Sequence, residues 1–250
     1  MSNYFIDTNS KQITFTDNRF YRTEDGNSVP SVTTILQAYP KDSHFFQWLK
    51  QVGEDADNIR DEAGRRGSIV HSLTERYDAG EEITLLTQSG EIGYKLSEWA
   101  MFERYVHFRD CHFLEVIHSE FNIISEQLNF AGTIDRVITL NGKNYLVDIK
   151  TSNAVHEFYW LQLQAYKRLL WEHYDSDKVV DGVAILWLNA KTRTYGKAGA
   201  IQGPGWQLLI RETANEQNDW ELFLATQKLW TAQNQGLQPR QLTYKLNHKL

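Results

Sequence analysis

Cysteine is almost absent from this chain, whose 250 residues include one, Cys111. A single cysteine excludes an internal disulfide and any zinc or iron–sulfur site that needs four cysteine ligands. No apolar run approaches the ~20 residues that a membrane-spanning helix requires. The N-terminal segment resembles neither a secretory signal peptide nor a transit peptide. We therefore expect a cytoplasmic protein that is not bound to a membrane.

An excess of positive charge is also missing. Lys and Arg number 26 against 32 Asp and Glu, which gives a net charge of −6. No overall basic field therefore points to nucleic acid. An acidic protein can nevertheless bind phosphate through local basic stripes and metal ions, so the net charge does not exclude a nucleic-acid partner.

Hydrophobic periodicity divides the chain into a helical first part and a mixed second part. We find no internal repeat or obvious linker, and we expect one compact domain with a section at 1–110 and a core at 111–250. The order of elements predicts an α/β fold in which helices flank a mixed β-sheet. The expected elements of the first part are a hairpin around Asp17 and Asn18 and helices at about 32–39, 44–52, 55–78 and 89–109. Those of the second part are strands at 114–124, 129–140 and 144–151, a helix at 156–174, strands at 179–188 and 205–211, and a helix at 218–234.

Two acids and an amine lie on two expected strands that Asn141-Gly142 joins as a hairpin. Side chains alternate along a strand, so Asp148 and Lys150 share one face, and the hairpin can bring Asp135 to Asp148. Two adjacent carboxylates repel unless a proton or a cation lies between them, and carboxylate oxygens suit Mg²⁺ or Mn²⁺. The Ile149 carbonyl could add a ligand, while Lys150 could orient or deprotonate water. The alternative is a salt bridge on a solvated sheet face.

Three further signals add candidate residues, each with a structural alternative. His71 and Glu75 share a face of one expected helix, where Gly67 allows close approach of a backbone or ligand; alternatively, His71 is a surface histidine. Glu120 lies in an apolar strand, where it or Glu115 is the outward-facing acid. Gln162 and Tyr166 are one turn apart on an apolar helix and face the site or pack in the helix–sheet seam.

The spacing of these motifs resembles the RecB-type branch of the PD-(D/E)XK nuclease superfamily over about residues 29–190. The motifs are G-x-x-x-H (67–71), G-x-x-D (132–135), D-x-K-T-S (148–152) and Q-x-x-x-Y (162–166). VPSVTTIL (29–36) is similar to a signature of the mitochondrial genome maintenance exonuclease and its phage relatives. The resemblance implies a restriction-endonuclease-like core with a helical arch over DNA. It also implies metal ligation by His71, Asp135, Asp148 and Glu120, catalysis by Lys150, and an accessory role for Gln162 and Tyr166.

The chain also departs from some of these relatives. One cysteine cannot hold the four-cysteine cluster that certain members carry, and neither a helicase motor nor a transit segment is evident. The resemblance thus implies a Mg²⁺-dependent DNA exonuclease, with Mn²⁺ as a substitute, that acts on single strands or DNA ends in phage or bacterial recombination, repair or genome processing. The alternatives are a structure-specific endonuclease and a DNA-binding protein without nuclease activity. Recombination or replication proteins could be its protein partners.

DNA contacts are expected on the helical first part of the chain. Candidates are Ser31, Lys41, Lys50, Arg60, Arg65, Arg66 and Arg76, of which the four arginines surround His71 in the sequence. The alternative is a solvated helix face with Glu62 and Glu75 as partners. Tyr39, Phe45, Phe46 and Trp48 could stack on bases of a single strand, or most of them could belong to the core.

Overall fold

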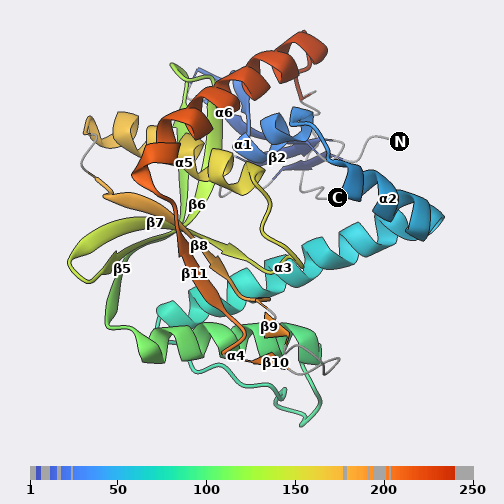
Figure 1. Ribbon diagram of the computed structural model, residues 1–250, viewed down its shortest axis with the longest axis vertical. Helices are drawn as coiled ribbons and strands as arrows, with labels where there is room; N and C mark the ends of the chain where they lie inside the picture. Colours follow the sequence, from blue (N-terminus) through green and yellow to red (C-terminus); the bar gives the residue numbers. More distant parts are fainter. Residues whose placement is uncertain are drawn as a thin grey trace, which may run out of the picture.

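A five-stranded mixed sheet forms the centre of the computed structural model (Figure 1). The structure describes residues 4–6, 12–15, 18–23, 25–176, 179–190, 192–193, 201–202 and 204–239. Its strand order is β11-β8-β7-β6-β5, and neighbours run antiparallel except for the parallel pair β7 and β8. The strands are β5 (Leu114–Ser125), β6 (Phe130–Leu140), β7 (Lys143–Lys150), β8 (Gly182–Trp187) and β11 (Gln207–Ile210).

Helices cover both faces of this sheet, and each interface has its own hydrophobic core. The helices are α1 (Val32–Ile35), α3 (Ala56–Asp78), α4 (Leu96–Cys111), α5 (Phe158–Tyr174) and α6 (Thr213–Gln233). On one face α3 and α4 pack through Val70 and Met101 against Val147 and Ile149. On the other face α1, α5 and α6 enclose a core that includes Leu146. The predicted restriction-endonuclease-like architecture, a mixed sheet between helices with an N-terminal helical section, is therefore confirmed.

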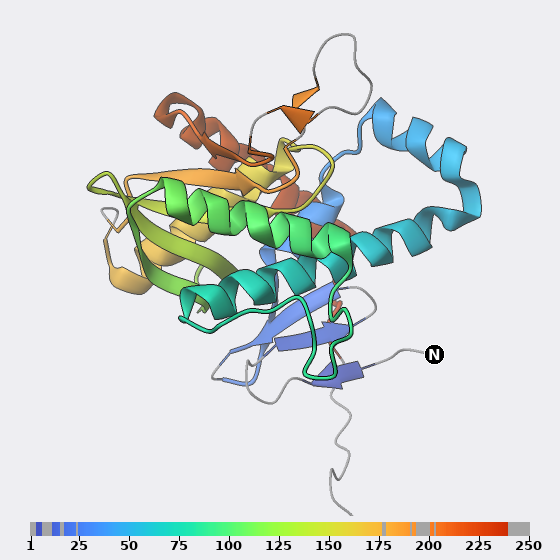
Figure 2. The same cartoon turned by 90° about the horizontal axis from the view of Figure 1, so that it is seen from below.

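The N-terminal section adds a four-stranded antiparallel sheet and a projecting helix. Its elements are β1 (Tyr4–Ile6), β2 (Gln12–Phe15), β3 (Asn18–Arg22), β4 (Ser28–Pro30), the 3-10 helices η1 (Leu36–Ala38) and η2 (Gly53–Asp55), and α2 (Ser43–Val52). A two-stranded ribbon, β9 (Thr192–Arg193) and β10 (Ile201–Gln202), lies apart from both sheets. Figures 1 and 2 show α2 and the first part of α3 as an elbow that extends beyond the layers around the central sheet.

Local sequence signals account for most element boundaries. The expected hairpin in the first section is present as β2 and β3, whose registered ends are Phe15 and Asn18. Asn141 and Gly142 adopt φ angles of 53° and 75°, which are the positive values that a tight hairpin turn requires. Ser31 caps α1 as expected, because its hydroxyl accepts the Thr34 amide at 3.0 Å.

The start of α4 was predicted wrongly. It begins at Leu96 rather than near residue 89, because the preceding segment closes a turn in which Gly90 donates to the Thr87 carbonyl. The N-terminus of α4 is instead stabilised by Glu98, whose carboxylate accepts the Lys95 amide at 2.8 Å. The start of α6 was also misplaced, at 218, since this helix begins at Thr213.

Among the described residues, no helix has both the length and the apolar character needed to cross a membrane. The expected division near residue 110 falls just before α4 ends at Cys111 and remains a prediction. Val70 of α3 nevertheless packs in the same core as Val147 of β7, so the helix that carries His71 is attached directly to the central sheet.

Candidate active site

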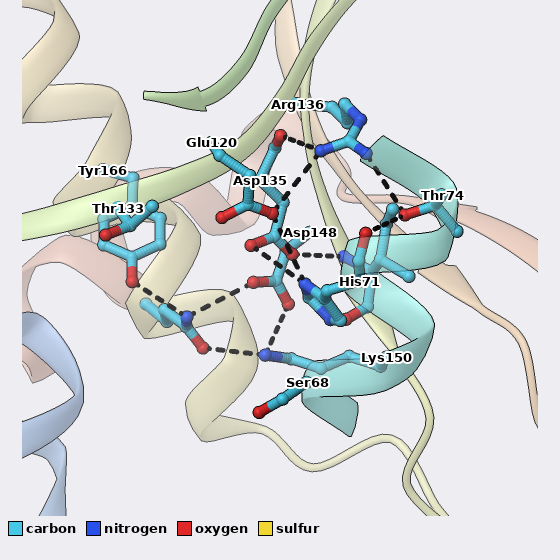
Figure 3. A network of polar contacts seen from close by, with 12 residues as sticks. Ser68, His71, Thr74, Glu120, Thr133, Asp135, Arg136, Asp148, Lys150 and Tyr166 are labelled. Atoms are coloured by element: carbon cyan, nitrogen blue, oxygen red, sulfur yellow. Dashed lines mark hydrogen bonds and ion pairs between the residues drawn. The ribbon is translucent and has the colours of Figure 1, made fainter. Parts of the chain in front are cut away.

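Three elements bring an imidazole and two carboxylates together near the carboxyl end of β7. His71 comes from α3, Glu120 from β5 and Asp135 from β6 (Figure 3). The Nδ1 atom of His71 lies 3.6 Å from Asp135 Oδ1 and 3.8 Å from Glu120 Oε1. One ligand atom from each of the three residues lies within 4.8 Å of the other two. This is a donor set that divalent cations such as Mg²⁺ and Mn²⁺ accept.

The second part of the site lies on β7 and α5. Asp148 Oδ2 is 2.6 Å from Lys150 Nζ, so the two side chains share one face of the strand as alternation predicts. Gln162 connects them to the helix, because its Oε1 accepts from Lys150 Nζ at 3.1 Å and its Nε2 donates to Asp148 Oδ1 at 3.3 Å. The same amide nitrogen donates to the Tyr166 hydroxyl at 3.1 Å. The motif pair Gln162 and Tyr166 therefore faces the site rather than the seam alone.

Asp135 joins the two parts of the site. Its Oδ2 accepts the backbone N–H of Ile149 at 2.8 Å, which holds its carboxylate against β7. The carbonyl oxygen of the same residue, Ile149, is 2.9 Å from His71 Nε2. In Figure 3 dashed lines connect the Asp135 carboxylate to His71 and the Asp148 carboxylate to Lys150. Asp135 thus lies between His71 and β7, next to the Asp148–Lys150 pair.

The site holds an excess of negative charge, and the protonation of its groups reflects this. Burial alone would lower the pKa of His71, but the charges of Asp135, Glu120 and Asp148 outweigh it and raise that pKa to about 9. Burial raises the pKa of Asp148 to about 6, with Asp135 adding to the shift and Lys150 opposing it. Burial opposes charge on Lys150 too, yet Asp148 and Asp135 raise its pKa overall. Positive charge is therefore favoured at the centre of the site.

Glu120 is placed in the site by an irregular stretch of β5. The register of β5 against β6 shifts between Val116 and His118, and Glu120 itself has φ of 47°. Such a left-handed conformation is rare for residues other than glycine and costs about 1–3 kcal/mol. Its Oε1 atom is buried without a hydrogen-bond partner in the described residues. Glu115 is exposed, so Glu120 rather than Glu115 faces His71, and its unsatisfied oxygen fits a cation ligand.

A buried arginine supports this arrangement and was missed in the sequence. Arg136 is 1% exposed, and its guanidinium donates to Asp78 at 2.8 Å, to Thr74 at 3.1 Å and to the Asp135 carbonyl at 2.6 Å. It also lies 3.5 Å from Glu120 Oε1. Arg136 therefore fixes β6 against α3 close to two of the clustered acids. An arginine next to Asp135 in an otherwise apolar run was the available signal.

The two motif glycines, Gly132 and Gly67, differ in how closely neighbouring atoms approach them. A Cβ atom on Gly132 would lie 2.3 Å from Cε1 of Tyr166, so the ring of Tyr166 can occupy its place only because residue 132 has no side chain. A Cβ on Gly67 would meet Thr151 Oγ1 at 3.5 Å, which is an ordinary contact. The expected close approach of protein backbone to Gly67 is thus wrong for the described residues. Glu75 is exposed and outside the group around His71.

The expected DNA-binding residues have protein partners in several cases. Arg65 donates to Glu62 at 2.9 Å and also pairs with Glu98, and Arg76 donates to Glu81 at 2.7 Å. These pairs agree with the alternative of a solvated, salt-bridged helix face. The remaining basic candidates have varied surroundings: Arg60 lies near Asp57 and Asp61, Arg66 has no acid partner among the described residues, Lys41 lies over the Phe45 and Phe158 rings, and Lys50 is exposed in the last turn of α2.

Ser31 is buried, whereas the aromatic candidates on α2 are not. Ser31 is 2% exposed and serves as a helix cap, a position that argues against direct contact with DNA. The alternative that most of the aromatic candidates belong to the core is wrong for α2, because no residue of this helix is buried. Phe45 and Phe46 are 37% and 53% exposed.

Comparison with known proteins agrees with this geometry. The family model of the PD-(D/E)XK nuclease superfamily matches residues 41–240, which is 200 of 250 residues. No curated protein matches the sequence significantly. The matched range contains His71, Asp135, Asp148 and Lys150 of the site described above. Nucleases of this kind cut DNA with divalent metal ions, and the chain belongs to the PD-(D/E)XK nuclease superfamily.

Proposed function

We propose that this chain is a metal-dependent deoxyribonuclease of the RecB-like branch, an exonuclease that acts on single strands or free DNA ends. The observation that carries the proposal is the convergence of His71, Glu120 and Asp135 beside the Asp148–Lys150 pair. Mg²⁺ is the proposed cation, with Mn²⁺ as a substitute. Recombination, repair or genome processing in the cytoplasm of a bacterium, or of a phage-infected one, is the proposed setting.

The residues divide into those that would hold the cation and those that act on substrate. His71, Glu120, Asp135, Asp148 and the Ile149 carbonyl would hold it. A cation held there lowers the pKa of water and offsets negative charge on the scissile phosphate. Lys150, 2.6 Å from Asp148, is positioned to orient the attacking water, and its positive charge can offset that of the phosphate. Gln162 fixes the Lys150 amine, and Tyr166 fixes Gln162.

The decisive experiment is cleavage of single- and double-stranded DNA, labelled at the 5′ or the 3′ end, in Mg²⁺. Wild type should release short labelled products, and Asp148→Ala or Lys150→Ala should reduce the rate by about 100-fold or more. Glu120→Ala and Glu115→Ala provide a matched pair, because both remove a carboxylate from β5 but only Glu120 faces His71. Equal activity of these two variants would remove Glu120 from the proposed ligand set.

A closed circular strand separates an exonuclease from an endonuclease. An exonuclease needs an end, so it should leave circular DNA intact while it degrades the linear form. Cleavage of the circle would assign the endonuclease activity instead. Wild-type protein that binds DNA but cuts no substrate in Mg²⁺ or Mn²⁺ would refute nuclease activity and leave a binding protein.

A further inference from the structure

A cleft of 1090 Å³ lies beside the candidate active site, between α6, the segment that enters α2 and the loop that connects β7 to α5. Five of its lining residues are Phe, Trp or Tyr: Tyr39, Phe45, Trp48, Phe158 and Tyr159. Leucines of α6 complete the lining, including Leu229, which is 44% exposed. The volume is at the upper end of the range of about 300–1,000 Å³ that is usual for ligand pockets, which is enough room for unpaired bases.

The α2 side of this cleft has apolar side chains but no protein partner that buries them. No residue of α2 is buried, although the helix carries Phe45, Phe46 and Trp48. The Phe45 ring lies 5.9 Å from the Trp48 ring, so the two form one aromatic surface that faces the cleft. Because this elbow projects from the layers, the protein leaves much of that surface uncovered, and an external ligand would explain it (Figure 2).

Tyr159 connects the cleft to the catalytic lysine. Its ring lines the cleft, and Lys150 Nζ lies 4.4 Å from the centre of the same ring. Tyr159 also packs against Phe158, with ring centres 4.7 Å apart, and Phe158 stacks on His156 at 5.4 Å. A strand whose phosphate reached Lys150 would therefore have aromatic surfaces immediately beside it.

The charges around the cleft favour bases over phosphates. Lys41 is the one Lys or Arg among the lining residues, and Asp42 and Glu157 are the acids. Lys41 Nζ lies over the Phe158 ring at 5.4 Å, so part of its charge is directed at an aromatic face. A path for the phosphate backbone needs several cations, which this lining does not offer. Stacking of bases on aromatic rings needs no cations and is compatible with any base sequence.

We propose that this cleft binds the bases of a single DNA strand by stacking, directly beside the phosphate that Lys150 faces. The inference rests on the proposed nuclease function and specifies its substrate: unpaired bases must enter the cleft, so a strand must be single at the point of cutting. Trp48 and Phe45 on α2 and Tyr159 on the opposite side supply the stacking surfaces. The bases rather than the phosphates provide the affinity of the cleft.

The test is the affinity of full-length protein for two fluorescein-labelled strands, measured by anisotropy in EDTA so that no strand is cut. One is an ordinary single strand, and the other has the same length but abasic sites throughout. Trp48→Ala should raise the Kd for the ordinary strand by about 5- to 150-fold, as expected for one lost stacking contact. Phe46→Ala removes an aromatic ring from the same helix outside the cleft lining and should change that Kd by no more than about twofold.

Two internal controls keep the result interpretable. Trp48→Ala should leave the Kd of the abasic strand and the salt dependence of binding unchanged, because no phosphate contact is lost. The variant should fold, since α2 contributes no buried residue to the core. Equal effects of Trp48→Ala and Phe46→Ala, or an equal loss of affinity for the abasic strand, would overturn the proposal.

The remaining outcomes separate this inference from the nuclease assignment. If wild type cleaves DNA in Mg²⁺ but Trp48→Ala binds as wild type does, the cleft assignment fails and the nuclease stands. If wild type does not cleave DNA, and Trp48→Ala selectively weakens binding of the ordinary strand, the cleft assignment stands and the nuclease assignment fails. A change of sedimentation coefficient in Trp48→Ala without a change in DNA affinity would assign the cleft to contact between two copies of this chain, against our proposal.

Discussion

Replacing Gly132 with alanine tests how closely the G-x-x-D segment packs against α5. The added Cβ would lie 2.3 Å, 3.0 Å and 3.2 Å from three ring carbons of Tyr166, whereas unstrained carbon contacts are about 3.5–4.0 Å. The Tyr166 ring is 4% exposed and enclosed by the core between the sheet and α5. It cannot move without displacing its neighbours, so we expect a cost of about 1–3 kcal/mol in the free energy of unfolding.

A double-mutant cycle, read by urea denaturation, isolates the contact. If the ring is the obstacle, Gly132→Ala should cost about 1–3 kcal/mol in wild type but less than about 0.5 kcal/mol in a Tyr166→Ala background. In a Tyr166→Phe background the full cost should persist, because the ring remains. Gly64→Ala is the matched control: nothing lies within 4 Å of its added Cβ, and the substitution in α3 should stabilise by about 0.5–1 kcal/mol.

The same variants report on the site, because the Tyr166 hydroxyl accepts from Gln162, which in turn holds Lys150. A displaced ring should therefore lower the cleavage rate even where the protein remains folded. An equal loss of stability from Gly132→Ala with and without the Tyr166 ring would refute the reasoning, since the cost would then come from the backbone of β6.

Three further predictions concern the residues around the acids. Arg136→Met should lower the free energy of unfolding by about 3–5 kcal/mol in urea denaturation, because it leaves the buried Asp78 without one of its cations; a cost below about 1 kcal/mol would contradict this. In EDTA, the pKa of His71 is about 9 in the folded protein and about 6.5 in the unfolded protein. Protonated His71 therefore contributes its full stabilisation of the fold below pH 6.5, and up to about 3 kcal/mol of it is lost as the pH rises to 9. Denaturation midpoints of wild type and His71→Gln across that pH window measure this loss, and an unchanged slope in the variant would exclude His71 as its source. Gly67→Ala should stabilise α3 by about 0.5–1 kcal/mol, and an unchanged Kd for DNA would show that no ligand approaches Gly67 closely.

Local signals in the sequence were sufficient for most of the fold and for part of the site. Asn141-Gly142 determined the hairpin, and the hairpin together with strand alternation placed Asp148 and Lys150 on one face. These signals act over a few residues, where backbone stereochemistry dominates the free energy. The Gln162–Tyr166 pair likewise needed only the helical period to reach the same site.

What sequence could not give is the set of contacts between distant elements. Arg136 and Asp78 are 58 residues apart, and nothing local in either segment indicates that they form a buried ion pair. The identity of the acid on β5 depended on a shift of register after Val116, which moves Glu120 and not Glu115 toward His71. The aromatic residues of α2 were predicted to lie mostly in the core, because hydrophobic periodicity identifies an apolar helix face but not whether other parts of the protein cover that face.

The backbone at Glu120 has a consequence for the evolution of this chain. A φ of 47° suits glycine or asparagine, and either would relax the strand, yet neither side chain offers a carboxylate to the cluster. A lineage freed from cutting DNA should therefore drift toward glycine or asparagine at position 120, and that drift would raise the melting temperature as it erased the activity.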